Sequence, residues 1–186
     1  MKKLLFALTL CCFFATAGNA QDDEMMKKWM EMATPNQNHK KLEGFVGSWD
    51  AVVRMWMGPQ ASTSQGKAEM KMILDGRYLA QEFTSTMGNG MTMHGMGMMG
   101  YDNMNSKYFS TWIDNMGTGM YMSEGKMEKD QFVMQGKMDD PMTGEKGKAT
   151  KEVWQMVDND KLIFEMYMME NGKEMKTMEI TYIRKK

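Results

Sequence analysis

One short stretch of the chain, residues 91–101, holds soft side chains at a spacing that suits metal chemistry. It contains five methionines and three glycines around His94. In a β-strand alternate side chains point to the same face, so His94, Met96 and Met98 share one face. Imidazole and thioether groups are suitable ligands for Cu(I) or Ag(I). The sequence therefore offers His94, Met96 and Met98 as a candidate metal site.

Strand geometry limits this candidate metal site. Neighbouring side chains on one face of a strand lie about 7 Å apart, too far for all three to bind one ion from a flat strand. Binding a single ion requires either a bend at Gly95 and Gly97 or a ligand from another strand. The methionines available for that are Met70, Met72, Met120 and Met122.

Methionine is also common throughout the chain, which has 29 methionines among 186 residues. Methionine is unbranched and polarisable, and it fills irregular gaps in protein cores. We therefore expect most of the methionines to pack in the core. Metal binding and the scavenging of oxidants by reversible sulfoxide formation are the alternatives. Pairs two residues apart recur at Met55/Met57, Met70/Met72, Met120/Met122 and Met166/Met168.

The sequence contains none of the common catalytic motifs that we looked for. It lacks a nucleophile elbow, a zinc-protease helix, a phosphate-binding loop and a dinucleotide fingerprint. His39 lies in the polar run 36–41, and we expect it on an exposed helix face. These observations favour a protein that is not an enzyme, and they leave an enzyme of unknown reaction as an alternative.

The first twenty residues have the features of a secretory signal peptide. A positively charged N-terminal region is followed by an apolar run over residues 4–14 and then by small residues. This pattern predicts cleavage by a signal peptidase before Gln21. Both cysteines, Cys11 and Cys12, lie in this segment, so we expect a mature chain without disulfides. The sequence predicts an exported, periplasmic protein with no lasting membrane anchor.

The charge of the chain argues against nucleic-acid binding. Without Lys2 and Lys3, 21 of the 23 basic residues remain against 24 acidic ones, a net charge of −3 that is mixed along the chain. The length suits one domain after the signal peptide. We expect a signal peptide over residues 1–20, a helical segment over 21–45 and a barrel over 46–186.

Hydrophobic periodicity predicts two short helices followed by strands. The first helix covers residues 22–33, and the second covers 35–43 with Thr34 and Gln37 as a capping box. From Gly47 onward the period changes to two. The expected strands cover residues 47–57, 64–74, 77–86, 91–101, 107–114, 120–128, 131–138, 149–157, 161–169 and 174–184.

About ten strands joined by short hairpins predict a closed sheet. An open sheet of this length leaves two edges exposed, and closure removes them. The sequence therefore predicts an all-β, up-and-down antiparallel barrel with one or two short N-terminal helices.

Several short motifs together resemble a known family. They are Gly47–Asp50, Leu74–Leu79, Gly100–Asp102, Thr111–Asp114 and Met178–Tyr182. As a set they are similar to the bacterial domain of unknown function 1579 (DUF1579). The resemblance implies a calycin-like, lipocalin-related barrel with no established activity, and it makes Trp49 similar to the tryptophan that plugs the closed end of such barrels. A more distant resemblance is to haem-binding nitrobindin-like barrels, which use a histidine near the C-terminal strands, whereas this sequence has none after His94.

Barrels of this kind can enclose a small apolar ligand or fill their interior with side chains. Methionine and aromatic residues in the strands favour a binding module for a small apolar or amphipathic ligand, since methionine-lined sites adapt to varied partners. The pattern does not assign the ligand-binding residues or an oligomeric state. Periplasmic binding or buffering of Cu(I) through His94, Met96 and Met98 is the alternative function.

Overall fold

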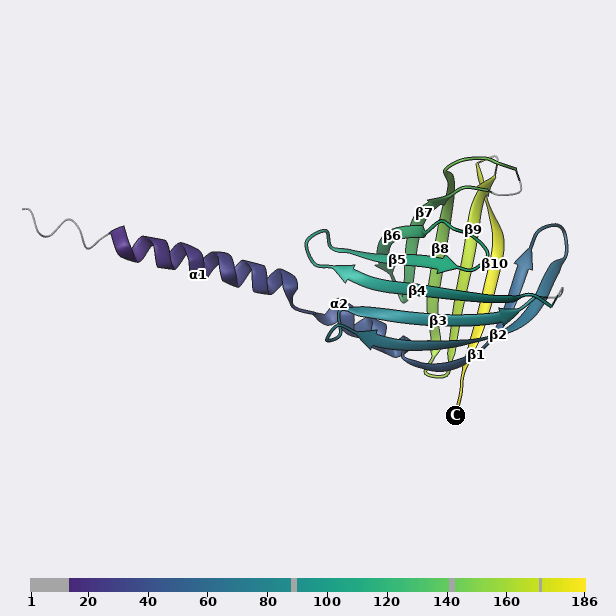
Figure 1. Cartoon of the computed structure of the whole chain (residues 1–186), viewed down its shortest axis with the longest axis horizontal. Coiled ribbons are helices and arrows are strands. Elements are labelled where there is room, and N and C mark those ends of the chain that lie inside the picture. Colours follow the sequence, from purple (N-terminus) through teal and green to yellow (C-terminus); the bar gives the residue numbers. More distant parts are fainter. Residues whose placement is uncertain (1–13, 88–89, 141–142, 171) are drawn as a thin grey trace, which may run out of the picture. The chain divides into compact units, whose positions relative to one another are not determined.

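The computed structural model of the chain describes residues 14–87, 90–140, 143–170 and 172–186. The chain divides into two compact units, Met1–Thr34 and Pro35–Lys186, which are described separately here. Figure 1 shows the helices and strands of both units. Residues 1–13 of the predicted signal peptide lie outside the described residues.

The described part of the first unit is one helix, α1 (Phe14–Ala33). The predicted helix over residues 22–33 lies within it, and α1 also includes residues 14–21, where alanines favour a helix. At its C-terminal end, the hydroxyl of Thr34 donates a hydrogen bond of 2.6 Å to the carbonyl oxygen of Met30. Among the described residues, no helix is both long enough and apolar enough to cross a membrane.

The second unit begins with a short helix, α2 (Gln37–Lys40), and a 3₁₀ turn, η1 (Lys41–Phe45). The prediction of Thr34 and Gln37 as a capping box is wrong, since Asn36 is the N-cap. Its Oδ1 accepts from the Asn38 amide at 2.8 Å, and its own amide donates to Nδ1 of His39 at 3.0 Å. Thr34 is instead hydrogen-bonded to the end of α1. The predicted second helix is therefore a capped turn of α-helix followed by 3₁₀ structure.

The rest of the second unit is a closed antiparallel barrel of ten strands, which confirms the predicted fold class. Each strand pairs with its neighbours in sequence, and the last strand pairs with the first. Figure 1 shows β2–β5 crossing β7–β10, as the two sides of a small barrel do. The strands are β1 (Gly47–Trp56), β2 (Ala61–Ile73), β3 (Tyr78–Thr86), β4 (Thr92–Asp102), β5 (Lys107–Asp114), β6 (Tyr121–Glu128), β7 (Gln131–Met138), β8 (Lys148–Asp158), β9 (Lys161–Glu170) and β10 (Lys173–Arg184).

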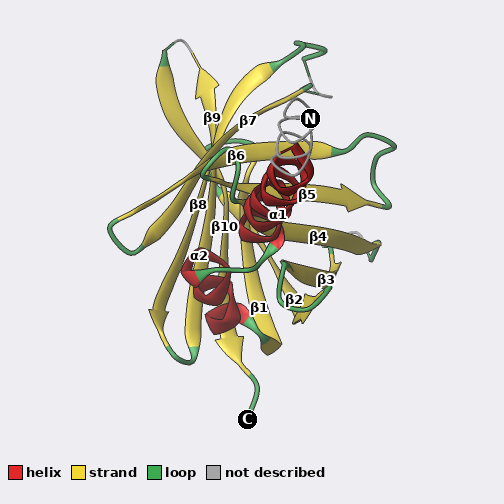
Figure 2. Cartoon of the chain, turned by 90° about the vertical axis from the view of Figure 1, so that its left-hand side faces the viewer, coloured by secondary structure: helices red, strands yellow, loops and turns green. Residues whose placement is uncertain are grey.

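The residues of η1 and Trp49 close one end of the barrel. Leu42, Phe45 and Trp49 are at most 1% exposed, and Nε1 of Trp49 donates to the carbonyl oxygen of Phe45 at 2.9 Å. The guanidinium of Arg184, on β10, lies 4.1 Å from the centre of the Trp49 ring. It also donates to the carbonyl oxygens of Val46 and Gly44. Figure 2 shows α2 at the start of β1. Trp49 thus has the structural role that its resemblance to lipocalin-like barrels implied.

Side chains alternate between the two faces of the barrel wall, as the period of two predicts. On β3, for example, Leu79, Gln81, Phe83 and Ser85 are buried inward while Glu82 and Thr84 are exposed. The buried inward side chains form one core cluster. Its strand residues are Trp49, Ala51, Val53, Ala68, Met70, Leu79, Phe83, Met99, Tyr108, Phe132, Met134, Trp154, Leu162, Phe164, Ile180 and Tyr182.

Candidate ligand site in the barrel lumen

The inward-facing side chains form the interior of the barrel, which we call the lumen. Near the end covered by η1 the lining is apolar and fully buried. Toward the opposite end, inward-facing side chains stay partly accessible to solvent. They are Ser64, Met93, Trp112, Tyr121 and Met166. The end opposite η1 is therefore the more solvent-accessible end of the barrel interior.

Glycines on the inner wall let large aromatic rings lie flat against it. A Cβ atom on Gly95 would be 2.1 Å from Cζ2 of Trp112, and one on Gly97 would be 3.2 Å from Cε3 of the same ring. Likewise, a Cβ on Gly66 would be 2.8 Å from Cζ of Phe83. The ring of Phe83 also contacts other rings of the interior, with its centroid 6.2 Å from those of Trp112 and Tyr182.

The lumen also contains polar groups. Six inward-facing polar residues are each at most 7% exposed: Gln81, Ser85, Ser110, Ser123, Thr150 and Glu152. Five of them form side-chain hydrogen bonds with residues of other strands. Nε2 of Gln81 donates to the hydroxyl of Tyr182 at 3.1 Å, and the hydroxyl of Ser85 donates to the carbonyl oxygen of Gln65 at 3.0 Å. A lumen built only to be a packed core would not need this set, because each buried polar group must find a partner.

Glu152, in the middle of β8, is the carboxyl group inside this set. It is 3% exposed and accepts a hydrogen bond of 2.6 Å from the hydroxyl of Ser123 on β6. Burial raises the pKa of Glu152 to about 7, and the Ser123 hydrogen bond opposes that rise. Burial also raises the pKa of Tyr121 to about 12, with the charge of Glu152 adding to the effect. The phenol of Tyr121 shares a 2.8 Å hydrogen bond with the hydroxyl of Thr150.

Trp154 follows Glu152 on the same inward face of β8 and is 8% exposed. Its ring contacts Phe164 with the centroids 4.5 Å apart and stacks on Tyr182 at 6.1 Å. Its Nε1 is buried and has no hydrogen-bond partner among the described residues. An unpaired buried donor is costly, which makes this N–H exceptional among the described side chains.

The methionines divide between the lumen and the outer surface. The core-packing prediction agrees with the burial of Met70 and with the inward, half-buried positions of Met72, Met166 and Met168. It is wrong for the pair Met120/Met122 and for Met57, which are exposed. Their exposed fractions are 60%, 58% and 80%. The period of two placed each pair on one face but did not say which face is inside.

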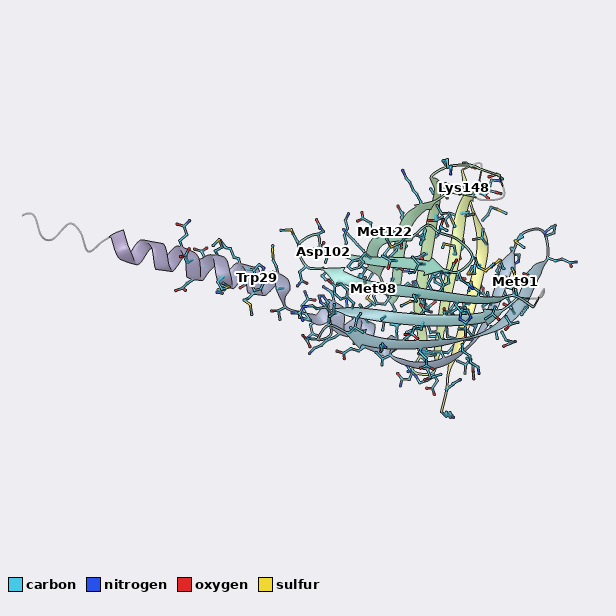
Figure 3. All side chains as sticks on the ribbon, in the orientation of Figure 1. Trp29, Met91, Met98, Asp102, Met122 and Lys148 are labelled. Atoms are coloured by element: carbon cyan, nitrogen blue, oxygen red, sulfur yellow. The ribbon has the colours of Figure 1, made fainter. Side chains whose placement is uncertain are left out.

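His94, Met96 and Met98 share one face of β4, as predicted, and that face is the outer one. His94 and Met96 are exposed, and Met98 is half-buried. Pairing of β4 with β3 is continuous from Thr92 to Gly100, so a single-ion site at these residues would need a ligand from another strand. Gly95 and Gly97 accommodate Trp112. Figure 3 labels Met98 on β4 and Met122 on β6. Metal binding by His94, Met96 and Met98 stays a prediction.

His39 is not on an exposed helix face, and that prediction is wrong. Its side chain is 5% exposed and lies edge-on to the ring of Tyr101 at 5.7 Å. Burial lowers the pKa of His39, a hydrogen bond with the Tyr101 backbone opposes this, and the charge of Arg77 lowers it further. The polar run around His39 concealed its burial because only this side chain of the run turns inward in the capping box.

A groove of about 510 Å³ lies outside the barrel on β7–β10. Lys151 crosses it, contacts Glu174 and stands 4.5 Å above the ring of Tyr167. The residues around it are Gln135, Gly136, Lys137, Ala149, Thr150, Lys151, Met169 and Glu174. This groove is separate from the lumen, because its side chains belong mainly to the outward-facing set.

The family model described as "Protein of unknown function (DUF1579)" matches residues 34–184. The chain belongs to this family. The match begins at the boundary between the two units and ends at the last residue of β10. It confirms the family resemblance, and the DUF1579 match thus covers α2, η1 and the whole barrel.

Two solved structures share the DUF1579 barrel. Rv2717c from M. tuberculosis has a TM-score of 0.57 at 11% identity, covering 82% of this chain and all 100% of that one. The S-type phycobiliprotein lyase CPES from Guillardia theta has a TM-score of 0.55 at 12% identity, with 82% and 99% covered. At these identities the similarity shows the fold alone. No curated protein matches the sequence.

Proposed function

We propose that this barrel binds a small apolar or amphipathic ligand in its lumen. The observation that carries the proposal is the placing of Trp112 and Phe83 on glycines of the wall. The glycines let these rings lie close to the wall, and the partly accessible inward residues support ligand entry from the end opposite η1. Half-buried methionines on the same wall, such as Met93 and Met166, can adjust to the shape of an apolar ligand.

A fluorescent apolar dye, N-phenyl-1-naphthylamine, tests the proposal. We expect saturable binding to the purified chain, because the dye is small and uncharged and suits an apolar cavity. Ser64→Trp adds bulk on the inner wall, and Gln65→Trp adds the same bulk on the outer wall one residue away. The first variant should weaken dye binding about tenfold or more, and the second should leave it unchanged. Equal binding by both variants would show that the dye does not enter the lumen.

The exposed methionines support a second candidate, the binding of Cu(I) on the outer surface of the barrel. The supporting observation is that His94, Met96 and Met122 are exposed, so core packing does not explain them. Soft thioether and imidazole groups favour Cu(I). Competition with a Cu(I) chelator tests this candidate, with Met57→Ala as the matched control on another surface. An affinity unchanged in His94→Ala and Met96→Ala would reject the site.

Export to the periplasm is proposed together with ligand binding, from the signal-peptide features of residues 1–20. The N-terminal residue of the mature protein, determined by sequencing after expression with the signal peptide, tests it. We expect Gln21 as the first residue. Recovery of the uncleaved chain from the cytoplasm would refute export.

A further inference from the structure

We propose that Glu152 anchors the ligand in the lumen and that the ligand is an amphipathic molecule carrying a protonated amine. This inference rests on the proposed function, since it names the chemistry of the ligand for the same lumen. Three features of the barrel interior support it: an unpaired carboxyl group, an acidic set of neighbours, and an aromatic surface beside it.

The carboxyl group of Glu152 lacks a cationic partner within the protein. It is 3% exposed, and in the described part of the chain it forms no salt bridge and accepts its hydrogen bond from Ser123. A buried carboxylate is costly without a counter-charge. A protonated amine on the ligand supplies that counter-charge inside the lumen, where a charge pair is screened less than in water.

Apart from Lys148, the buried polar residues described on the inner wall are neutral or acidic. From β6 comes Tyr121, whose phenol is bonded to Thr150. From β10 comes Tyr182, which accepts from Gln81. On β5, the other acidic side chain of the inner wall, Asp114, accepts a 2.8 Å hydrogen bond from Nε1 of Trp112. None of these groups offers a positive charge to an anionic ligand.

The basic side chain on the inward face of β8, Lys148, is engaged by acidic partners. Its Nζ lies 3.3 Å from Asp140 and 3.4 Å from Glu170. Figure 3 labels Lys148 at the end of the barrel where β7 connects to β8. A ligand carboxylate would have to compete with both partners for this cation, whereas an amine meets a free carboxyl at Glu152. The charges of the lumen therefore select amines over carboxylates.

Trp154 adds a second, independent indication of a ligand. The unpartnered Nε1 of this 92% buried indole provides a donor for a ligand oxygen or nitrogen. Beside Glu152 on the same face, the ring of Trp154 packs with those of Phe164 and Tyr182, at centroid distances of 4.5 Å and 6.1 Å. Ammonium groups are attracted to such rings, which reinforces the preference for an amine.

The test uses three probes with the same ten-carbon chain: decylamine, decanol and decanoic acid. Each displaces N-phenyl-1-naphthylamine from the purified chain at pH 8, where an alkylamine is protonated. We expect decylamine to bind about tenfold or more tightly than decanol, and decanoic acid to bind more weakly than decanol. In Glu152→Gln the advantage of the amine over the alcohol should fall to about twofold or less. Glu82→Gln removes a carboxylate from the outer surface of β3 and should keep the full advantage.

The outcomes separate this inference from the proposed function. Equal affinities of the wild type for decylamine and decanol overturn the amine proposal and leave lumen binding intact. Displacement by none of the three probes, or no binding of the dye, overturns both. Should Glu152→Gln fail to fold, the wild type at pH 5 replaces it, because Glu152 with a pKa of about 7 is then protonated. An amine advantage that is the same at pH 5 and pH 8 overturns the proposal.

Discussion

The indole of Trp112 lies against the backbone of Gly95 on the neighbouring strand, with no room for a methyl group between them. A Cβ atom at residue 95 would be only 2.1 Å from Cζ2 of the ring, well inside van der Waals contact. Gly97 lies under the same indole. Gly95 and Gly97 therefore accommodate an aromatic ring on the inner wall, while the neighbouring His94 and Met96 point outward.

Gly95→Ala should destabilise the barrel. The added methyl group forces Trp112 from its position, and overpacking of this kind costs about 1–3 kcal/mol. Gly119→Ala is the matched control, since a Cβ there meets no atom within 4 Å. Urea unfolding followed by tryptophan fluorescence measures both. A Gly95→Ala midpoint equal to that of the control would show that the ring does not depend on the glycine.

Glu152 should make the stability of the free protein depend on pH. Its pKa is raised from 4.5 to about 7 by burial, so the folded state binds the proton more tightly than the unfolded state. Stability is then fully present below about pH 4.5, falls as the pH rises to about 7, and levels off above that. The total loss is at most about 3 kcal/mol, since one pKa unit corresponds to about 1.4 kcal/mol.

Glu152→Gln tests this pH dependence, because glutamine does not ionise. We expect the variant to be more stable than the wild type at pH 8 and to match it closely at pH 4.5. The free energy of unfolding is measured at several pH values, with Glu82→Gln as the exposed control. A difference between Glu152→Gln and wild type that stays constant across the range would contradict a titrating Glu152.

Arg184→Lys should weaken the closed end of the barrel although it keeps the charge. Lysine cannot donate to the Gly44 and Val46 carbonyl oxygens at once while lying flat on Trp49, as the guanidinium does. We expect a loss of about 1–3 kcal/mol in the free energy of unfolding. Lys185→Arg, at the next position, should change it by less than about 0.5 kcal/mol. Thermal unfolding measures the stability of both variants. An Arg184→Lys variant as stable as the wild type would mean that the positive charge alone matters at this end.

The barrel was predictable because its strands alternate and its connections are short. Ten runs of period two joined by hairpins leave closure as the way to remove both edges, and the pairing of β1 with β10 confirms it. Trp49 was predictable from its resemblance to lipocalin-like barrels. The cap of α2 was misplaced by two residues because Thr34, Asn36 and their neighbours offer two overlapping capping patterns.

The polar residues of the lumen were harder to predict from the sequence than the fold. On β8, Thr150, Glu152 and Trp154 occupy one face, while Lys151 and Val153 occupy the other. Both faces mix polar and apolar residues, so alternation alone does not say which is inside. An aromatic ring near a glutamate does not decide it either, because Glu165 and Tyr167 show the same spacing on the outer face of β9.

The register that joins β1 to β10 has a consequence for how the chain acquires its structure. The bond from Arg184 to Val46 spans 138 residues, so the two ends of the domain must meet before the sheet can close. Contacts this distant in sequence raise the relative contact order and slow folding. Until the last strand has formed, β1 has an unpaired edge open to aggregation. A nascent chain lacking β10 therefore cannot complete the barrel, and we expect folding to finish only after the whole domain has been synthesised.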